Sequence, residues 1–270
     1  MTRVKQTVSR QAPWAAFGAV MLIANVSCGK MPEAANEVKL TPAAEIAETP
    51  SITGKVMLQG ADAAKLRKLV DVGGNPFCTG HGDIIDPTWR VAADGALADA
   101  VITVRGSQRA SNLPLVAPLI DQTKCEFLPH TVAIQPGQNV RFHNSDLTFH
   151  NIRIARQEAG THGKGENIDN IGQPSRGDEN VKAFQVPGIY RLECDVHRWM
   201  SAWVFVHEGV HNAVSATDGC FTITRALMDG EYVVEAWHPQ FPQKLSQTVT
   251  IRGGKATADF TFDFAKAFQL

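Results

Sequence analysis

The chain has 270 residues, with 26 Lys and Arg against 27 Asp and Glu, and 44% of its residues are hydrophobic. This balance is typical of a soluble globular protein and excludes a disordered charged tail, a collagen and a polytopic membrane protein. A net charge of −1 provides no basic surface for nucleic acid, so we expect no nucleic-acid partner. The length allows one large domain or two small ones.

The start of the chain has the pattern of a secretory signal. Residues 1–27 carry three basic residues and no acidic one, and their apolar run, residues 14–26, is shorter than the ~20 residues that a membrane span needs. Cys28 stands where a bacterial lipoprotein carries its lipid, although Asn25 occupies a position where Leu is usual. We therefore expect a signal peptide at 1–27 and a periplasmic protein. Whether a lipid at Cys28 anchors it to the membrane stays open.

The next residues predict a tether and then a series of strands. Residues 28–50 contain three Pro, four Glu and no aromatic residue, which cannot build a core. From residue 51, short runs rich in Val, Ile and Thr alternate with turns and predict strands at 52–58, 100–104, 131–134, 139–143, 181–186, 189–194, 202–207, 220–224, 232–237, 247–251 and 256–262. Residues 157–179 predict a long loop, and residues 61–98 give no clear element. This pattern predicts an all-β protein built from sandwiches.

The most informative segment places three metal-binding side chains in one loop. Cys194, His197 and Met200 follow one another at intervals of three residues, and a strand that leads into a tight loop can turn all three toward one point. Thiolate and thioether are soft ligands, and imidazole is borderline. With a second His they form the trigonal His₂Cys site with a long axial Met that selects copper for electron transfer. His150 supplies the second imidazole from a neighbouring predicted strand.

The two stretches resemble the blue copper proteins, or cupredoxins. The Phe-x-Asn and His-Asn run over 142–151 is similar to the plastocyanin-type strand that carries the first His ligand. The Pro-Gly-x-Tyr-x-x-x-Cys-x-x-His-x-x-Met run over 187–200 is similar to the family's ligand loop in its short, amicyanin-like version. The resemblance, over residues 130–207, implies a cupredoxin-like Greek-key β-sandwich in which Asn151 ties the two ligand loops together. It implies one type 1 copper held by His150, Cys194, His197 and Met200.

Other interpretations of the same residues explain less. A buried thiol beside a surface imidazole needs no metal, structural zinc generally uses paired Cys or paired His, and a Cys–His nucleophile leaves His150 and Met200 without a role. One thiol in the loop excludes a dinuclear copper site, and a Cys flanked by Glu and Asp differs from the multicopper oxidases. We therefore expect one mononuclear centre in an electron carrier and not an enzyme. His143 matches a non-ligand position, and we expect His130 to be structural, with a distant ligand as the alternative.

The remaining cysteines are expected to form one disulfide in an oxidising periplasm. Cys78 and Cys125 lie in irregular stretches that flank the same domain, so we pair them, and Cys220 is expected to be a lone buried thiol. A Cys125–Cys220 pair is the alternative.

Residues 212–263 resemble the carboxypeptidase-regulatory-like, or transthyretin-like, module. The resemblance lies in an Asp-Gly-Cys-Phe run, an Asp-Gly-Glu-Tyr run that ends at Trp237, and two alternating strands. It implies a small β-sandwich without catalytic residues. About 55 residues is few for an independent core, so strand 52–58 either completes this module or belongs to the copper domain. The expected domains are 51–208 for copper and 209–270 for this module, with Trp237 either packed at a strand end or part of an interaction surface.

The expected function is one-electron transfer by a periplasmic type 1 copper protein, with a cytochrome or a dehydrogenase as redox partner. The alternatives are a periplasmic binding or adhesion protein that recognises a glycan or a partner, with copper structural or absent, and a copper storage or delivery protein. In a short loop the ring edge of His197 is expected to reach the surface beside Phe149 and Trp199 and to carry the electron. Met200 is expected to be a weak axial ligand that tunes the potential.

Overall fold

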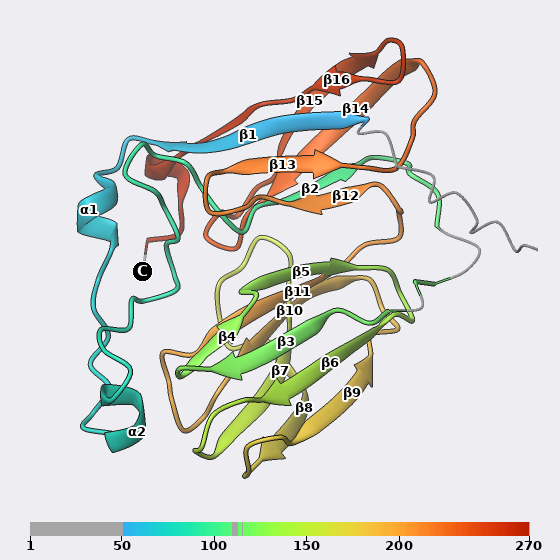
Figure 1. The fold of residues 1–270 in the computed structure, drawn as a ribbon. Coiled ribbons are helices and arrows are strands. Elements are labelled where there is room, and N and C mark those ends of the chain that lie inside the picture. Colours follow the sequence, from blue (N-terminus) through green and yellow to red (C-terminus); the bar gives the residue numbers. More distant parts are fainter. Residues whose placement is uncertain (1–50, 110–112, 115, 270) are drawn as a thin grey trace, which may run out of the picture. The chain divides into compact units, whose positions relative to one another are not determined.

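The computed structural model describes residues 51–109, 113–114 and 116–269 (Figure 1). The predicted signal peptide, Cys28 and the tether lie outside these residues. The described chain is nearly all β, as predicted, with two one-turn helices, α1 (Ala63–Leu66) and α2 (Pro76–Thr79), and a 3-10 turn, η1 (Phe264–Lys266). Within the described ranges no helix has the length and apolar character needed to cross a bilayer.

The middle of the chain forms a first sandwich of two sheets, with strand orders β5-β11-β10-β7-β8 and β4-β3-β6-β9. Its strands are β3 (Leu119–Thr123), β4 (Glu126–Leu128), β5 (Thr131–Ile134), β6 (Asn139–Asn144), β7 (His150–Gln157), β8 (Glu166–Gln173), β9 (Glu179–Ala183), β10 (Gly188–Glu193) and β11 (Ser201–Val206). Alternate side chains of both sheets point inward, so Phe127, Phe142 and Leu192 belong to one buried core.

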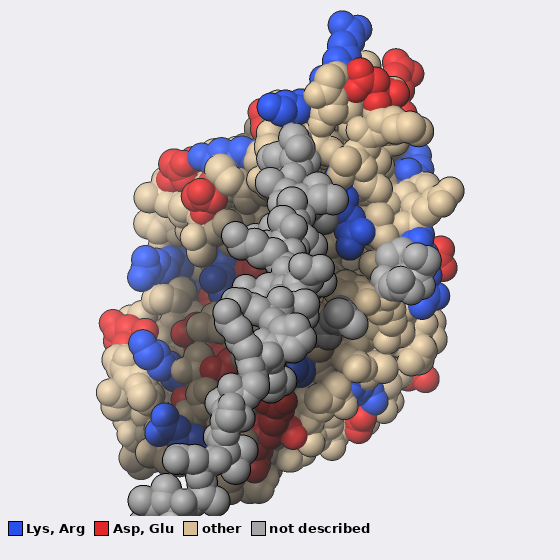
Figure 2. Space-filling view, turned by 45° about the vertical axis from the view of Figure 1, so that its right-hand side comes forward, with Lys and Arg blue, Asp and Glu red and all other residues tan. Residues whose placement is uncertain are grey.

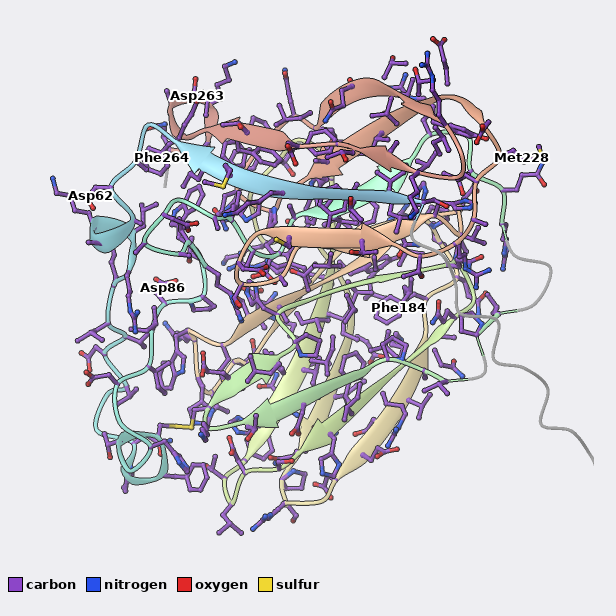
Figure 3. The ribbon with its side chains drawn as sticks, turned by 45° about the horizontal axis from the view of Figure 1, so that its top comes forward. Asp62, Asp86, Phe184, Met228, Asp263 and Phe264 are labelled. Carbon is purple, nitrogen blue, oxygen red and sulfur yellow. A yellow bond between two sulfur atoms is a disulfide. The ribbon has the colours of Figure 1, made fainter. Side chains whose placement is uncertain are left out.

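The rest of the described chain forms a second sandwich. One of its sheets has the order β13-β1-β16, with β17 also paired to β1, and the other has the order β12-β2-β14-β15. The strands are β1 (Ile52–Gln59), β2 (Val101–Val104), β12 (Asn212–Val214), β13 (Cys220–Ile223), β14 (Gly230–Trp237), β15 (Leu245–Ile251), β16 (Ala256–Thr257) and β17 (Phe260–Asp263). Figure 3 labels Phe184, buried in the first core, and Phe264, which packs against the second.

Strands β1 and β2 correct the predicted domain boundary. The copper domain was expected to begin at residue 51, but β1 pairs with β13, β16 and β17, and β2 pairs with β12 and β14. Ile52 and Val56 of β1 are fully buried in the second core. The first strand of the first sandwich is β3. The C-terminal residues were too few for a core of their own, and β1 completes it, which was the alternative that the sequence left open.

Strand β8 lies inside the predicted loop 157–179 and corrects that prediction. It pairs antiparallel with β7 at the edge of the five-stranded sheet, and most of its side chains are exposed. An edge strand with exposed side chains needs no apolar alternation, so its sequence has the polar composition of a loop. The long irregular stretch 61–98, in contrast, contains only α1, α2 and isolated bridges.

The two sandwiches share a small aromatic cluster. Trp203 and Phe205 of β11 pack against Trp237 of β14, with ring centroids 6.0 and 5.1 Å apart. Trp237 is 7% exposed, so it is a packed residue and not an exposed interaction surface. On the face drawn in Figure 2, described Lys and Arg residues are interspersed with Asp and Glu, in agreement with the near-zero net charge.

His238 follows Trp237 and is buried among aromatic rings. Its ring lies 5.8 Å from that of Trp89, 5.7 Å from that of Phe241 and 5.9 Å from that of Phe262. Burial lowers the pKa of His238 to about 3, although Asp99 acts in the opposite direction. The folded protein therefore holds this ring neutral, whereas the unfolded chain binds a proton below the ordinary pKa of 6.5.

This difference predicts acid sensitivity. Above pH 6.5 neither state binds the proton and His238 adds no pH dependence; below it, only the unfolded state gains a proton until the pH approaches 3. We expect His238 to remove up to about 1.4 kcal/mol of unfolding free energy per pH unit in this window. Denaturant unfolding between about pH 7 and pH 4 should give a shallower profile for His238→Gln than for the wild type. Parallel profiles would contradict the assignment.

Candidate metal centre

Pairing of β7 with β10 brings the predicted ligands together. Glu193 at the end of β10 pairs with Arg153 of β7, so Cys194, which follows β10, lies next to the start of β7 at His150. His197 lies in the tight loop between β10 and β11. This loop is closed by two backbone hydrogen bonds, from the Cys194 N–H to the Met200 carbonyl and from the Met200 N–H to the His197 carbonyl.

Three donor atoms converge in this buried space. The Nδ1 atoms of His150 and His197 are 3.0 Å apart, and Cys194 Sγ lies 4.0 and 3.7 Å from them, respectively. The three residues are at most 2% exposed, and their donor atoms form one candidate metal-binding group. Met200 is 1% exposed and lies in the same core cluster as Cys194. The role of Met200 as the fourth ligand stays a prediction.

The surroundings of Cys194 favour the thiolate. Burial raises the pKa of this thiol, but the contacts with the imidazoles of His150 and His197 and with the backbone N–H groups of Asn151 and His197 lower it to about 6. The His197 N–H donates to Sγ at 3.4 Å. The thiolate is the form that binds metals, so the site holds this donor in its binding form at neutral pH.

Asn151 makes the connection between the two ligand loops that the resemblance implied. Its Oδ1 accepts the Asp195 N–H at 2.7 Å, and its Nδ2 donates to the Asp195 carboxylate at 2.8 Å and to Asn170 Oδ1 at 2.7 Å. Asn151 follows His150 and Asp195 follows Cys194. These bonds therefore fix the distance between the loops that carry the imidazole and the thiolate.

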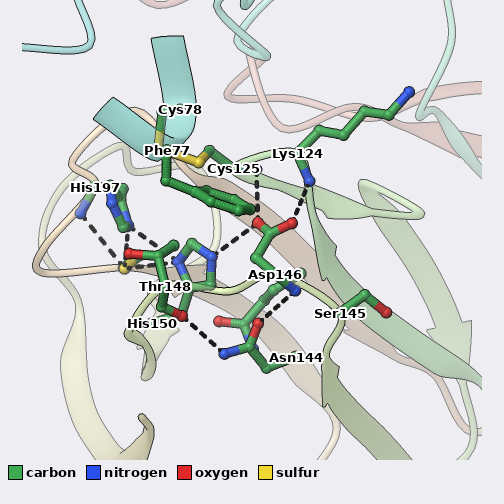
Figure 4. Close-up of polar contacts among 12 residues, drawn as sticks. Phe77, Cys78, Lys124, Cys125, Asn144, Ser145, Asp146, Thr148, His150 and His197 are labelled. Atoms are coloured by element: carbon green, nitrogen blue, oxygen red, sulfur yellow. Dashed lines mark hydrogen bonds and ion pairs between the residues drawn. A yellow bond between two sulfur atoms is a disulfide. The ribbon is translucent and has the colours of Figure 1, made fainter. Parts of the chain in front are cut away.

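Asp146 orients His150 from behind (Figure 4). Its Oδ2 lies 3.0 Å from His150 Nε2 and accepts the Cys125 N–H at 2.8 Å, while Oδ1 accepts the Lys124 N–H at 2.7 Å. Burial raises the pKa of Asp146, but its hydrogen bonds to His150, Cys125 and Lys124 lower it by more. The net pKa of Asp146 is therefore below its usual range. The carboxylate holds the proton of His150 on Nε2, which leaves Nδ1 free to bind a metal.

His197 differs from the expected exposed imidazole. It is 1% exposed, and its Nε2 lies 2.9 Å from Nδ2 of Asn75, at the start of α2. Trp199 packs near the His197 ring, with centroids 5.3 Å apart, while Phe149 is 43% exposed. The prediction that His197 reaches the surface is wrong because residues around α2, which gave no clear element in the sequence, cover its ring.

The disulfide prediction is confirmed. Cys78 of α2 and Cys125 are bonded and both fully buried. Cys220 is free, as expected, but exposed and not buried, because it lies on the outward face of β13. His130 is structural, as predicted: it is buried, and its Nδ1 lies 3.1 Å from the Asp99 carboxylate.

Asn75 and Asp146 were not found by sequence reasoning. Asp146 lies four residues before His150, and the Asn-Pro pair that begins α2 is a usual helix start. Either pattern is common in loops, so neither predicted a contact with a ligand.

The comparisons with known proteins address the middle of the chain. Residues 116–207 match the family model described as copper binding proteins, plastocyanin/azurin family. These residues form a cupredoxin domain. The thiolate and imidazole donors converge inside it, and this donor set fits copper.

Solved structures similar to the chain include the following three. Amicyanin from Paracoccus versutus is 22% identical, with a TM-score of 0.30; the match covers 39% of this chain and 97% of amicyanin. A purple cupredoxin from Nitrosopumilus maritimus is 23% identical (TM-score 0.28; 33% and 99% covered). A copper-containing nitrite reductase from Thermus scotoductus is 21% identical (TM-score 0.28; 37% and 24% covered). A comparison with curated proteins gave no match.

Asp146 is predicted to matter for stability as well as for orientation. Asp146→Ala leaves two backbone N–H groups and His150 Nε2 without their acceptor in a buried environment. We expect the free energy of unfolding to fall by roughly 3 kcal/mol in denaturant titration. Asp83→Ala, at an exposed position, is the matched control and should stay near the wild-type value. Equal stability of the two variants would contradict this role.

Proposed function

We propose that the protein is a type 1 copper protein that transfers single electrons. The observation that carries this proposal is the convergence of His150 Nδ1, His197 Nδ1 and Cys194 Sγ in one buried space, with the thiol pKa lowered to about 6. Copper, when bound by these donors, supplies a one-electron couple between Cu(II) and Cu(I).

The protein contributes a rigid and dry environment for these donors. Asp146 and Asn75 each contact the remote nitrogen of one imidazole, and the loop hydrogen bonds of Asn151 hold Cys194 in place. Fixed donors change position little between oxidation states. The donors are at most 2% exposed, which suits electron transfer over a distance and gives a substrate no direct access, so we assign an electron carrier and not a catalyst.

The location and the partners follow from other features. The predicted signal sequence and the buried Cys78–Cys125 disulfide support an oxidising compartment such as the periplasm. We propose a periplasmic cytochrome or dehydrogenase as redox partner, and a lipid at Cys28 as the link to the membrane. We also propose that the second sandwich is a transthyretin-like module; its sheets around β1 and β14 support a β-sandwich without assigning it a chemistry.

The optical spectrum tests the proposed function. Charge transfer from thiolate to Cu(II) should give the purified protein an intense visible band, and Cys194→Ser should lose it because the hydroxyl is no soft donor. Cys220→Ser, at the exposed free thiol, is the matched control and should keep the band. Wild-type protein that takes up Cu(II) and stays colourless would refute the type 1 assignment.

The axial position makes a separate prediction. Met200→Gln replaces a soft thioether by a harder oxygen donor, which favours Cu(II), so the reduction potential should fall while the protein stays coloured. Met228→Gln, with an 83% exposed side chain, is the control and should leave the potential unchanged. Voltammetry compares the three proteins. An unchanged potential in Met200→Gln would mean that Met200 is not a ligand, and loss of the metal would mean that it is more than a weak one.

A further inference from the structure

Residues 69–85 form a cover over the candidate copper centre. The two ends of the cover meet at a bridge between Leu69 and Ile85 and at a hydrogen bond from the Val70 N–H to the Ile84 carbonyl, 2.9 Å long. Ile84 is buried in the core of the cupredoxin domain, and Phe77 packs against it. The cover is therefore a closed loop that is packed onto the domain.

The cover is attached covalently beside the ligands. Its Cys78 is bonded to Cys125, and the two sulfur atoms and a ring nitrogen of His197 all lie within 4.8 Å of one another. The Cys125 N–H donates to Asp146, and the Cys125 carbonyl accepts the Trp199 indole N–H at 3.0 Å. The attachment point is thus part of the network that also holds His150.

Asn75 is the residue of the cover that reaches a ligand. Its Oδ1 accepts the N–H groups of Phe77 and Cys78 at 3.0 and 3.2 Å, which caps α2 and fixes the side chain. Its Nδ2 then faces His197 Nε2 at 2.9 Å. The amide therefore has one end in the cover and the other end against the imidazole.

We propose that Asn75 is a positioning residue for the ligand His197, delivered by the disulfide-anchored cover. The assignment rests on the proposed copper-binding function. Asn75 fixes the rotation of the imidazole about its bond to the chain, and the Cys78–Cys125 disulfide of the cover lies beside the same ring. The matching contact on His150 is made by Asp146, so both imidazoles are held at their remote nitrogens.

Asn75 Nδ2 can only donate, so in this arrangement His197 Nε2 accepts and the proton of the neutral ring lies on Nδ1. A neutral His197 that binds a metal through Nδ1 carries its proton on Nε2, which needs an acceptor. The amide oxygen of Asn75 can supply this acceptor only if the amide turns over and gives up its bonds to α2. Aspartate at this position offers an oxygen to both sides, and its charge increases the basicity of the ligand.

The first experiment needs no metal. The metal-free full chain is alkylated with iodoacetamide, and peptide mass mapping follows Cys194, with the exposed Cys220 of the same molecule as internal reference. Asn75→Ala should raise the alkylation rate of Cys194 about tenfold, the effect of losing one net hydrogen bond, and Asn75→Asp should restore the wild-type rate. Asn167→Ala, an exposed Asn of β8, is the matched control and should change nothing.

The second experiment uses the copper-loaded chain and reads the potential. Asn75→Asp should keep the visible band and lower the reduction potential, because a carboxylate on Nε2 favours Cu(II). A structural capping role alone would leave the potential unchanged, since aspartate and asparagine cap helices equally well.

The outcomes separate this proposal from the proposed function. Wild-type alkylation of Cys194 in Asn75→Ala, or an equal increase in Asn167→Ala, overturns the positioning role. An unchanged potential in a coloured Asn75→Asp also overturns it. A colourless wild type refutes the type 1 assignment, and a tenfold effect of Asn75→Ala on Cys194 would still support the contact between Asn75 and His197.

Discussion

The candidate site depends on one junction, the turn at Cys125. Lys124 and Cys125 both have positive φ angles, 54° and 60°, so the turn between β3 and β4 points its two N–H groups at the same carboxylate, that of Asp146. That carboxylate orients His150, and the side chain of Cys125 anchors α2, which brings Asn75 to His197. The orientation of both imidazoles thus follows from the backbone conformation of two residues. Positive φ at both positions is what a two-residue hairpin between β3 and β4 uses, and here neither residue is glycine.

The parts of the site that the sequence predicted are those set by local spacing. Cys194, His197 and Met200 share one loop, and His150 begins the strand that pairs with β10, so pattern and pairing suffice to bring three donors together. The contacts around the donors come from far away along the chain: Asn75 is 122 residues from His197. Nothing in a strand pattern specifies which irregular segment will fold back over a loop. The expectation of an exposed His197 failed for this reason.

The fold shows the same division between local and distant information. The alternating pattern of residues 52–58 was enough to predict a strand, and β1 is that strand, but its partners β13, β16 and β17 lie more than 150 residues later. Hydrophobic alternation identifies the buried face of a strand and leaves open which core receives it. The disulfide was predictable because only Cys78, Cys125 and Cys220 remained once Cys28 and Cys194 had been given other roles. That inference used the number of cysteines and no geometry. Cys220 was misjudged as buried because strand β13 turns its alternate positions outward.

Burial of His197 has a consequence for how the centre would exchange electrons. In a site with an exposed imidazole, a partner can contact the ligand itself, and the docking surface can be small and apolar. Here the remote nitrogen of His197 contacts Asn75, and that of His150 contacts Asp146, so any partner meets protein atoms outside the ligands first. The hydrogen bond from Asn75 to His197 joins the ligand to a segment that carries exposed residues, such as His81. Val196 and Arg198, the residues on either side of His197 in the ligand loop, are also exposed, so the surface next to the centre is formed by this loop as well as by the cover.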